Sequence, residues 1–116
     1  MRNEIWIYKL NKDFLDFKTL EVDKTPKDLY ELLFSLTKLK NVLKMTQNIY
    51  DLYNLQKLDL SENELTEIPK EIGNLLNLQE LNLSENELTE IPKEIGNLLN
   101  LQELNLSENE LKYRKK

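Results

Sequence analysis

This chain contains a repeat of 23 residues, which limits the folds open to it. Residues 55–77 return as residues 78–100 with changes at only two positions, 57/80 and 59/82. The first eleven residues of the second copy, LQELNLSENEL, appear again without change at 101–111. A fixed period of this length predicts an array of stacked units, because one unit this short cannot bury a core alone.

Within each copy the spacing of apolar residues changes from that of a strand to that of a helix. Leu58 and Leu60 alternate with polar neighbours, which is the period of a half-buried strand. Pro69 suits the first turn of a helix, and Gly73 predicts a left-handed exit from it. Each copy is expected to be a short strand, a turn and a brief helical or 3₁₀ return. The residues expected to point inward are Leu55, Leu58, Leu60, Leu65, Ile68, Ile72 and Leu75.

The leucine pattern L-x-x-L-x-L-x-x-N-x-L occurs three times, starting at Leu55, Leu78 and Leu101. Stacked copies would pair their strands in parallel, each supplying the apolar wall that its neighbour needs. On this pattern the chain resembles the leucine-rich repeat (LRR) family, in the 23-residue LxxLxLxxNxLxxIPxxI form of bacterial and Ras-suppressor-like intracellular members. The resemblance implies an α/β solenoid with a short parallel β-sheet on its concave side and short helices or 3₁₀ turns on its convex side.

The asparagine of the pattern invites both a structural and a functional interpretation. Its amide donates and accepts hydrogen bonds, which suits a buried turn whose backbone groups would otherwise lack partners. A metal or ligand site is the alternative. The resemblance implies a structural asparagine ladder, and its expected members are Asn48, Asn63, Asn86 and Asn109.

Residues 1–41 are expected to form an atypical cap that covers the first repeat. The alternating segments EIWIYKL and FLDFKTLEV, joined by the turn NKD, predict a β-hairpin. Thr25 is a suitable N-cap for an amphipathic helix from Pro26 to roughly Lys40. The apolar face of that helix comprises Leu29, Leu32, Leu33, Leu36 and Leu39. The aromatic residues Trp6, Tyr8, Phe14 and Phe17 are interpreted as core of the cap, with an aromatic ligand platform as the alternative.

Residues 42–54 are interpreted as a degenerate short repeat. Leu43, Met45 and Asn48 have the mutual offsets of a repeat strand, and 23 residues earlier Leu20 and Val22 occupy the equivalent positions. With residues 101–111 as a partial repeat and 112–116 as a basic tail, the chain is expected to form one LRR domain over residues 1–116.

Polar residues between the inward leucines are expected on one face of the sheet, since side chains alternate along a strand. The resemblance implies that this concave face binds a partner. The alternative is that a duplicated array repeats its solvated residues whether or not they bind anything. The rows across the strands are Lys57, Glu80 and Glu103; Asp59, Asn82 and Asn105; Ser61, Ser84 and Ser107; and, at the strand exits, Glu62, Glu85 and Glu108.

Composition argues against several kinds of chemistry. The chain has no Cys and no His, so it lacks a thiolate nucleophile, a sulfur metal site and the commonest general base. No cofactor or metal is expected, and an enzyme is disfavoured. Residues 55–111 carry thirteen Asp and Glu against Lys57, Lys70 and Lys93, which argues against nucleic acid and favours basic partners. No apolar run resembles a membrane span or signal peptide, so a cytoplasmic location is expected.

Two functions are consistent with these patterns. The first is a non-enzymatic protein–protein interaction module whose acidic concave face binds a basic or polar surface of an unidentified protein. The second is a structural protein that self-associates into a homo-oligomer through the strand edge of its last repeat. The residues expected at that edge are Glu103, Leu104, Leu106 and Tyr113.

Overall fold

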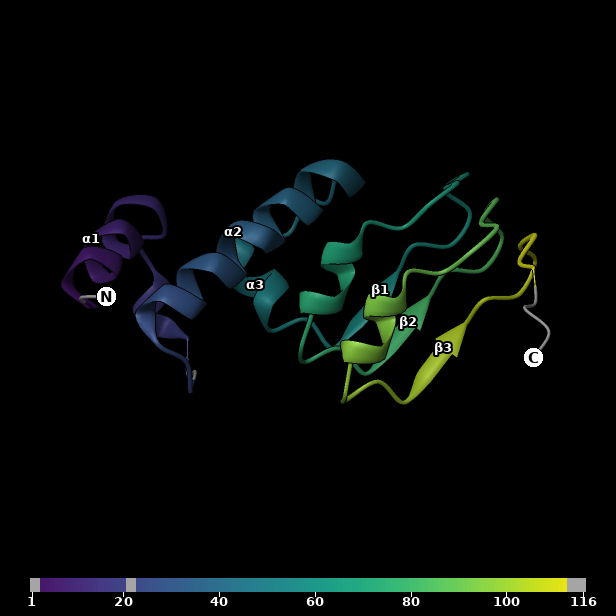
Figure 1. Cartoon of the computed structure of the whole chain (residues 1–116). Helices are drawn as coiled ribbons and strands as arrows, with labels where there is room; N and C mark the ends of the chain where they lie inside the picture. Colours follow the sequence, from purple (N-terminus) through teal and green to yellow (C-terminus); the bar gives the residue numbers. More distant parts are fainter. Residues whose placement is uncertain (1–2, 21–22, 113–116) are drawn as a thin grey trace. The chain divides into compact units, whose positions relative to one another are not determined.

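The computed structural model describes residues 3–20 and 23–112. The chain divides into two compact units, an N-terminal unit of Met1–Tyr53 and a repeat unit of Asn54–Lys116. Figure 1 labels the helices of the first unit and the strands of the second. In the repeat unit, short 3₁₀ helices alternate with the strands.

The N-terminal unit is helical. It contains α1 (Asn3–Asp13), the 3₁₀ helix η1 (Phe17–Thr19), α2 (Pro26–Leu43) and α3 (Ile49–Tyr53). The predicted start of α2 is confirmed, because the Thr25 side chain accepts a hydrogen bond from the backbone N–H of Asp28 at 3.1 Å. All five leucines predicted on its apolar face are buried. No helix in the described part of the chain has the length and apolar character to cross a membrane.

The predicted β-hairpin is wrong. The segment EIWIYKL lies within α1, and the described part of FLDFKTLEV, residues 14–20, contains η1 and no strand. Alternation in a short segment does not separate a strand from a helix that buries only part of one face. Contacts with α2 decide the outcome: the ring of Tyr30 lies 5.7 Å from that of Trp6 and 5.3 Å from that of Phe14, measured between centroids.

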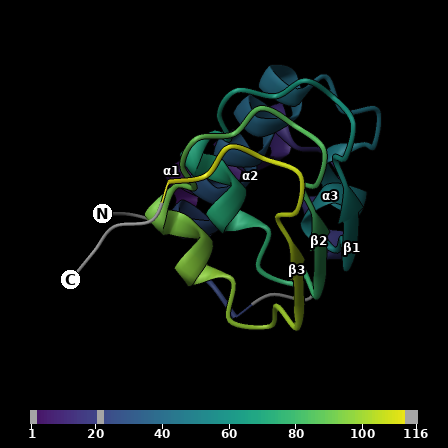
Figure 2. The ribbon, with the colours of Figure 1, turned by 90° about the vertical axis from the view of Figure 1, so that its right-hand side faces the viewer.

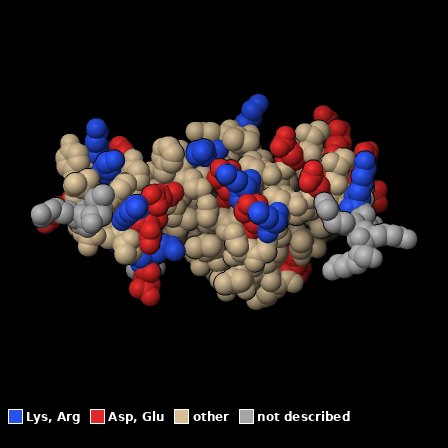
Figure 3. All heavy atoms as spheres, in the orientation of Figure 1, with Lys and Arg blue, Asp and Glu red and all other residues tan. Residues whose placement is uncertain are grey.

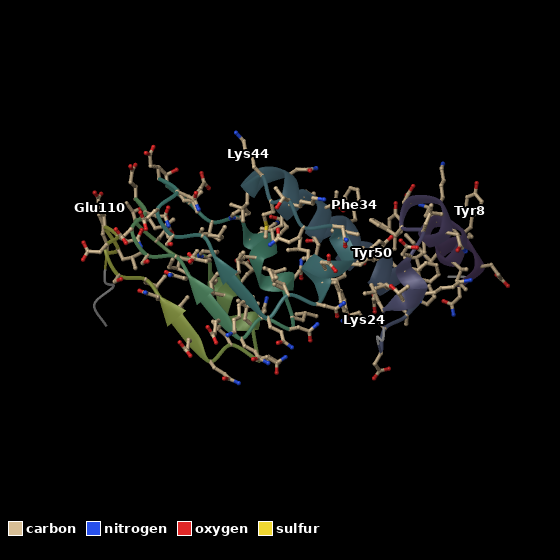
Figure 4. All side chains as sticks on the ribbon, turned by 180° about the vertical axis from the view of Figure 1, so that it is seen from behind. Tyr8, Lys24, Phe34, Lys44, Tyr50 and Glu110 are labelled. Atoms are coloured by element: carbon tan, nitrogen blue, oxygen red, sulfur yellow. The ribbon has the colours of Figure 1, made fainter. Side chains whose placement is uncertain are left out.

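The four aromatic residues assigned to the core of a cap have different environments. Phe14 is buried, whereas Trp6 and Phe17 are half-buried. Tyr8 is 67% exposed and projects from α1 in Figure 4, so its assignment to a core is wrong. The role of residues 1–41 as a cap stays a prediction.

The degenerate repeat strand predicted in residues 42–54 is also wrong. α2 continues past its expected end to Leu43, and Lys44 then ends it in the left-handed conformation. Asn48 is not part of a ladder. Its Oδ1 atom accepts hydrogen bonds from the backbone N–H groups of Tyr50 and Asp51 at 3.0 and 2.8 Å, so it caps α3. Of the earlier strand positions, Leu20 directly follows η1 and Val22 lies outside the described residues.

The repeat unit has the predicted parallel sheet. Its strands are β1 (Lys57–Asp59), β2 (Glu80–Asn82) and β3 (Glu103–Asn105), in spatial order β1-β2-β3. Equivalent positions of successive copies are paired, as in the register Leu58↔Leu81↔Leu104. The short returns are the 3₁₀ helices η2 (Lys70–Asn74) and η3 (Lys93–Asn97). Figure 2 shows the strands along one side of this unit and the helical turns along the other.

The core of the repeat unit lies between the strands and the 3₁₀ helices. Of the inward row predicted for the first copy, Leu55 and Leu65 are half-buried and the other five residues are buried. The left-handed exit predicted at Gly73 is wrong, since no glycine among the described residues has a positive φ. Gly73 is required for a different reason, because a Cβ atom there would lie 2.6 Å from the backbone oxygen of Glu94 in the next copy.

Candidate functional site

The candidate site is the outward side of the parallel sheet. We call it the strand face and define it by the outward side chains of β1 to β3, which are Lys57, Asp59, Glu80, Asn82, Glu103 and Asn105. These residues, together with the strand leucines, line a groove of about 430 Å³. Leu58 and Leu81 between them are buried, so the alternation predicted from the sequence places the polar side chains on the surface.

The first row of the strand face carries one ion pair and one carboxylate without a cation. Lys57 Nζ lies 3.5 Å from Glu80 Oε2, and the two side chains are 72% and 40% exposed. An exposed pair of this kind contributes about 0–1 kcal/mol. Glu103 continues the row on β3 and is exposed, with no salt bridge to any described residue.

The second row is organised by short-range hydrogen bonds. The Oδ1 atoms of Asp59, Asn82 and Asn105 accept hydrogen bonds from the backbone N–H of the serine two residues later, at 2.9, 2.9 and 3.0 Å. This is the Asx turn, in which a short side chain satisfies a backbone donor at the strand exit. At Asp59 the hydrogen bond from the Ser61 hydroxyl, at 2.6 Å, and that from its backbone N–H lower the pKa of the carboxyl group.

The serine row does not form a continuous surface. Ser107 is exposed and Ser61 is half-buried, but Ser84 is only 6% exposed. The placement of Ser84 on the binding face is therefore wrong. In the middle copy this position is covered by the copies on both sides, which the sequence of a single copy does not reveal.

The glutamates at the strand exits have a backbone conformation that the sequence does not indicate. Glu62, Glu85 and Glu108 each have a φ of 57°, in the left-handed region that favours glycine or asparagine. All three are exposed. In the space-filling view, acidic side chains gather over the end of the repeat unit where these loops lie (Figure 3). Glu110, in the last of the loops, projects from the same end (Figure 4).

The asparagine ladder is present at two of its four predicted positions. Asn86 is 7% exposed, and its Oδ1 accepts from the backbone N–H groups of Asn63 and Leu65 in the preceding copy. Its Nδ2 donates to the carbonyl oxygen atoms of Leu60, Leu83 and Ser84. Asn109 repeats this arrangement by bonding the backbone of the second copy. The ladder asparagines are therefore structural, and each joins its own copy to the one before it.

The first two predicted ladder positions, Asn48 and Asn63, differ from Asn86 and Asn109. Asn48 caps α3, as described above, and the side chain of Asn63 is exposed. Asn63 takes part in the ladder through its backbone N–H alone, which Asn86 accepts at 3.0 Å.

The strand edge predicted for self-association lies on β3. Within the described part of the chain, β3 pairs only with β2. Leu104 is 39% exposed and Leu106 is half-buried. Tyr113, the fourth predicted residue of this edge, lies outside the described residues.

Comparison with known proteins identifies the class to which this fold belongs. The model of the leucine rich repeat family matches residues 53–111, which is more than half of the chain. The chain therefore belongs to the leucine-rich repeat family and has its α/β fold.

Among solved structures, a leucine-rich repeat protein of Leptospira interrogans matches with 57% sequence identity and a TM-score of 0.51. The match covers 56% of this chain and 17% of that protein, so this chain spans a small part of the relative's length. No curated protein matches the chain.

Proposed function

We propose that this chain is a non-enzymatic protein-interaction module that binds a basic or polar protein surface through the strand face. Leucine-rich repeat domains generally mediate protein–protein interaction, and the strand face of this unit carries a groove lined by polar side chains.

One observation carries the proposal. The copies at 55–77 and 78–100 differ only at positions 57/80 and 59/82, and all four of these residues are outward side chains of β1 and β2. The core, the asparagine and the 3₁₀ turn are unchanged between the copies. Divergence confined to the strand face supports a role for that face in recognition, since a face that is merely solvated has no reason to differ more than the loops.

The charge of the strand face supports a basic partner. Lys57 is already paired with Glu80, while Asp59 and Glu103 carry exposed carboxylates without a cation among the described residues. Complementary charge accelerates encounter and excludes like-charged competitors, although rim charges add little affinity.

The test is a selection from a display library that contains both folded domains and unstructured peptides. Binders enriched on the parent chain should be lost on an Asp59→Lys/Glu103→Lys variant. They should be retained on Glu67→Lys/Glu90→Lys, which makes the same change in charge away from the strands. Equal retention on the two double variants, or no enrichment on the parent, would contradict the proposal.

Self-association through the β3 edge is the second candidate, supported by the exposure of Leu104. A continuation of the repeats would cover the same surface. In sedimentation across micromolar concentrations, self-association predicts a parent dimer or larger species that Leu106→Lys abolishes. Asn105→Lys, which points outward from the same strand, should preserve it. A parent that is monomeric throughout excludes this candidate.

A further inference from the structure

The hydrogen bonds of the second row fix which amide atoms the strand face offers to a ligand. A backbone N–H only donates, so the amide atom that meets the N–H of Ser84 or Ser107 must be Oδ1 of Asn82 or Asn105. The Nδ2 groups of these two asparagines are thereby left as donors, and they have no hydrogen bond to any described residue. Asp59 makes the same turn with a carboxylate and offers only acceptor oxygen atoms.

The charged groups of the strand face are also unevenly distributed across the sheet. The Lys57–Glu80 ion pair neutralises the start of the first row. Two carboxylates have no cation beside them among the described residues, Asp59 on β1 and Glu103 on β3, which lie at diagonally opposite corners of the sheet. The strand face thus offers two carboxylates, Asp59 and Glu103, that can each pair with a cation. The two amide donors, on Asn82 and Asn105, lie in the same row as Asp59.

The distance between the two carboxylates determines how far apart two cationic side chains of a ligand must be to reach both. Asp59 and Glu103 are two strands apart and two residues apart along the strand. With strands about 4.8 Å apart and a rise of about 3.3 Å per residue, their Cα atoms are separated by about 12 Å. An extended chain places side chains i and i+4 on the same side about 13 Å apart, whereas i+2 gives about 7 Å and i+6 about 20 Å.

We infer that the strand face binds an extended peptide segment that carries two Lys or Arg residues four positions apart. The two cations pair with Asp59 and Glu103, and main-chain carbonyl oxygen atoms of the segment accept hydrogen bonds from Nδ2 of Asn82 and Asn105. The inference rests on the proposed function, and it specifies the class of ligand that the same face recognises. Side-chain donors that meet the ligand's main chain are compatible with many ligand sequences, so selectivity comes from the spacing of the cations.

The experiment measures binding of three acetylated and amidated peptides by fluorescence anisotropy. Each is an eleven-residue Gly/Ser/Thr peptide with two Arg, at spacing i+2, i+4 or i+6, so that net charge is constant. The i+4 peptide is expected to bind the parent chain about fivefold more tightly than the other two, the size of effect that one well-placed exposed ion pair gives. The preference should persist at 150 mM salt, because a general electrostatic attraction would be screened equally for all three.

Variants separate the contributions of charge and amide. Asp59→Asn and Glu103→Gln should each remove the spacing preference, and Glu67→Gln, which removes a charge away from the strands, should keep it. Asn105→Asp preserves the acceptor of the Asx turn but removes the donor and adds negative charge. It should weaken binding of the i+4 peptide, whereas pure charge attraction predicts tighter binding of all three peptides.

Three outcomes overturn the inference: equal binding of the three peptides, binding of none, or uniformly tighter binding by Asn105→Asp. Its failure is distinguishable from failure of the proposed function. If the display selection yields binders that depend on the strand face but carry no pair of cations four positions apart, the proposed function stands and the proposed class of ligand is wrong. At neutral pH, circular dichroism should show a melting curve for each variant close to that of the parent, because every changed side chain is on the surface.

Discussion

Residues 78–88 and 101–111 have the same eleven-residue sequence but different environments. Leu81 is 2% exposed, whereas its counterpart Leu104 is 39% exposed. Ser84 is buried and Ser107 is exposed. The only difference between the two segments is their neighbours, since the middle copy has a repeat on each side. Burial in this unit is therefore a property of the stack and not of the local sequence.

The asparagine ladder shows the direction of this dependence. Asn86 satisfies backbone groups of the first copy, and Asn109 satisfies backbone groups of the second. Each copy thus relies on the next one for its hydrogen bonds. A change in one copy is expected to destabilise the copy before it, and identical substitutions in successive copies should have unequal effects.

The largest expected contrast is between two leucines of identical local sequence. Leu81→Ala should reduce the free energy of unfolding by about 2–5 kcal/mol, as truncation of a buried leucine does. Leu104→Ala should cost less than about 1 kcal/mol, because its side chain is already partly in solvent. Urea unfolding followed by far-UV circular dichroism measures both. The fluorescence of Trp6, the only tryptophan, reports on the N-terminal unit in the same samples. Equal losses would show that both leucines are equally buried in solution.

The next contrast in stability is between two asparagines of the repeat pattern, Asn86 and Asn63. Asn86→Ala removes hydrogen bonds to two copies and leaves buried backbone groups unpaired, so it should cost at least about 1–3 kcal/mol. Asn63→Ala, at an exposed side chain, should change stability by less than about 0.5 kcal/mol. Hydrogen exchange should show faster exchange of the Leu65 amide, which donates to Asn86, in the first variant only. The interpretation of the ladder fails if the two variants unfold alike.

The two glycines test close packing between copies. A Cβ atom at Gly73 would meet the backbone of Glu94, whereas one at Gly96 would meet no atom within 4 Å. Gly73→Ala should therefore cost about 1–3 kcal/mol through overpacking. Gly96→Ala should be neutral or stabilise by up to about 1 kcal/mol, since it restricts the unfolded chain at a permitted φ. Melting temperatures of the two variants give the comparison, and a matching loss at Gly96 would indicate that something packs against it.

The smallest effect expected comes from position 59, where the first copy has an acid and the others an amide. Hydrogen bonds from Ser61 lower the pKa of Asp59 in the folded state. This stabilisation is present above the unfolded pKa of about 3.9 and is lost as the pH falls through the lower folded value. Asp59→Asn keeps an acceptor without a titrating group, so its melting temperature should fall less steeply between about pH 5 and pH 2. Parallel profiles for parent and variant would contradict this assignment.

Most features of the repeat unit could be predicted from the spacing of its residues. The period of 23 residues, the parallel pairing of the strands, the inward leucines and the brief helical or 3₁₀ returns were all predicted from spacing, because every copy repeats the same local pattern. The outward positions of the strand face follow from alternation in the same way. Where a local pattern is repeated, every copy supports the same assignment of strand, turn and inward residues.

Spacing alone gave wrong predictions for residues whose environment depends on packing outside the repeats or between copies. The segment EIWIYKL alternates like a strand but lies in α1, where the ring of Trp6 packs on Tyr30 of α2. Asn48 has the offset of a ladder residue but caps α3, since an Asx side chain satisfies whichever backbone donors lie beside it. Ser84 is buried and Gly73 is required only because another copy lies against them. In the repeats, local spacing determines on which side of a strand a residue lies, and packing against the neighbouring copy decides what its side chain contacts.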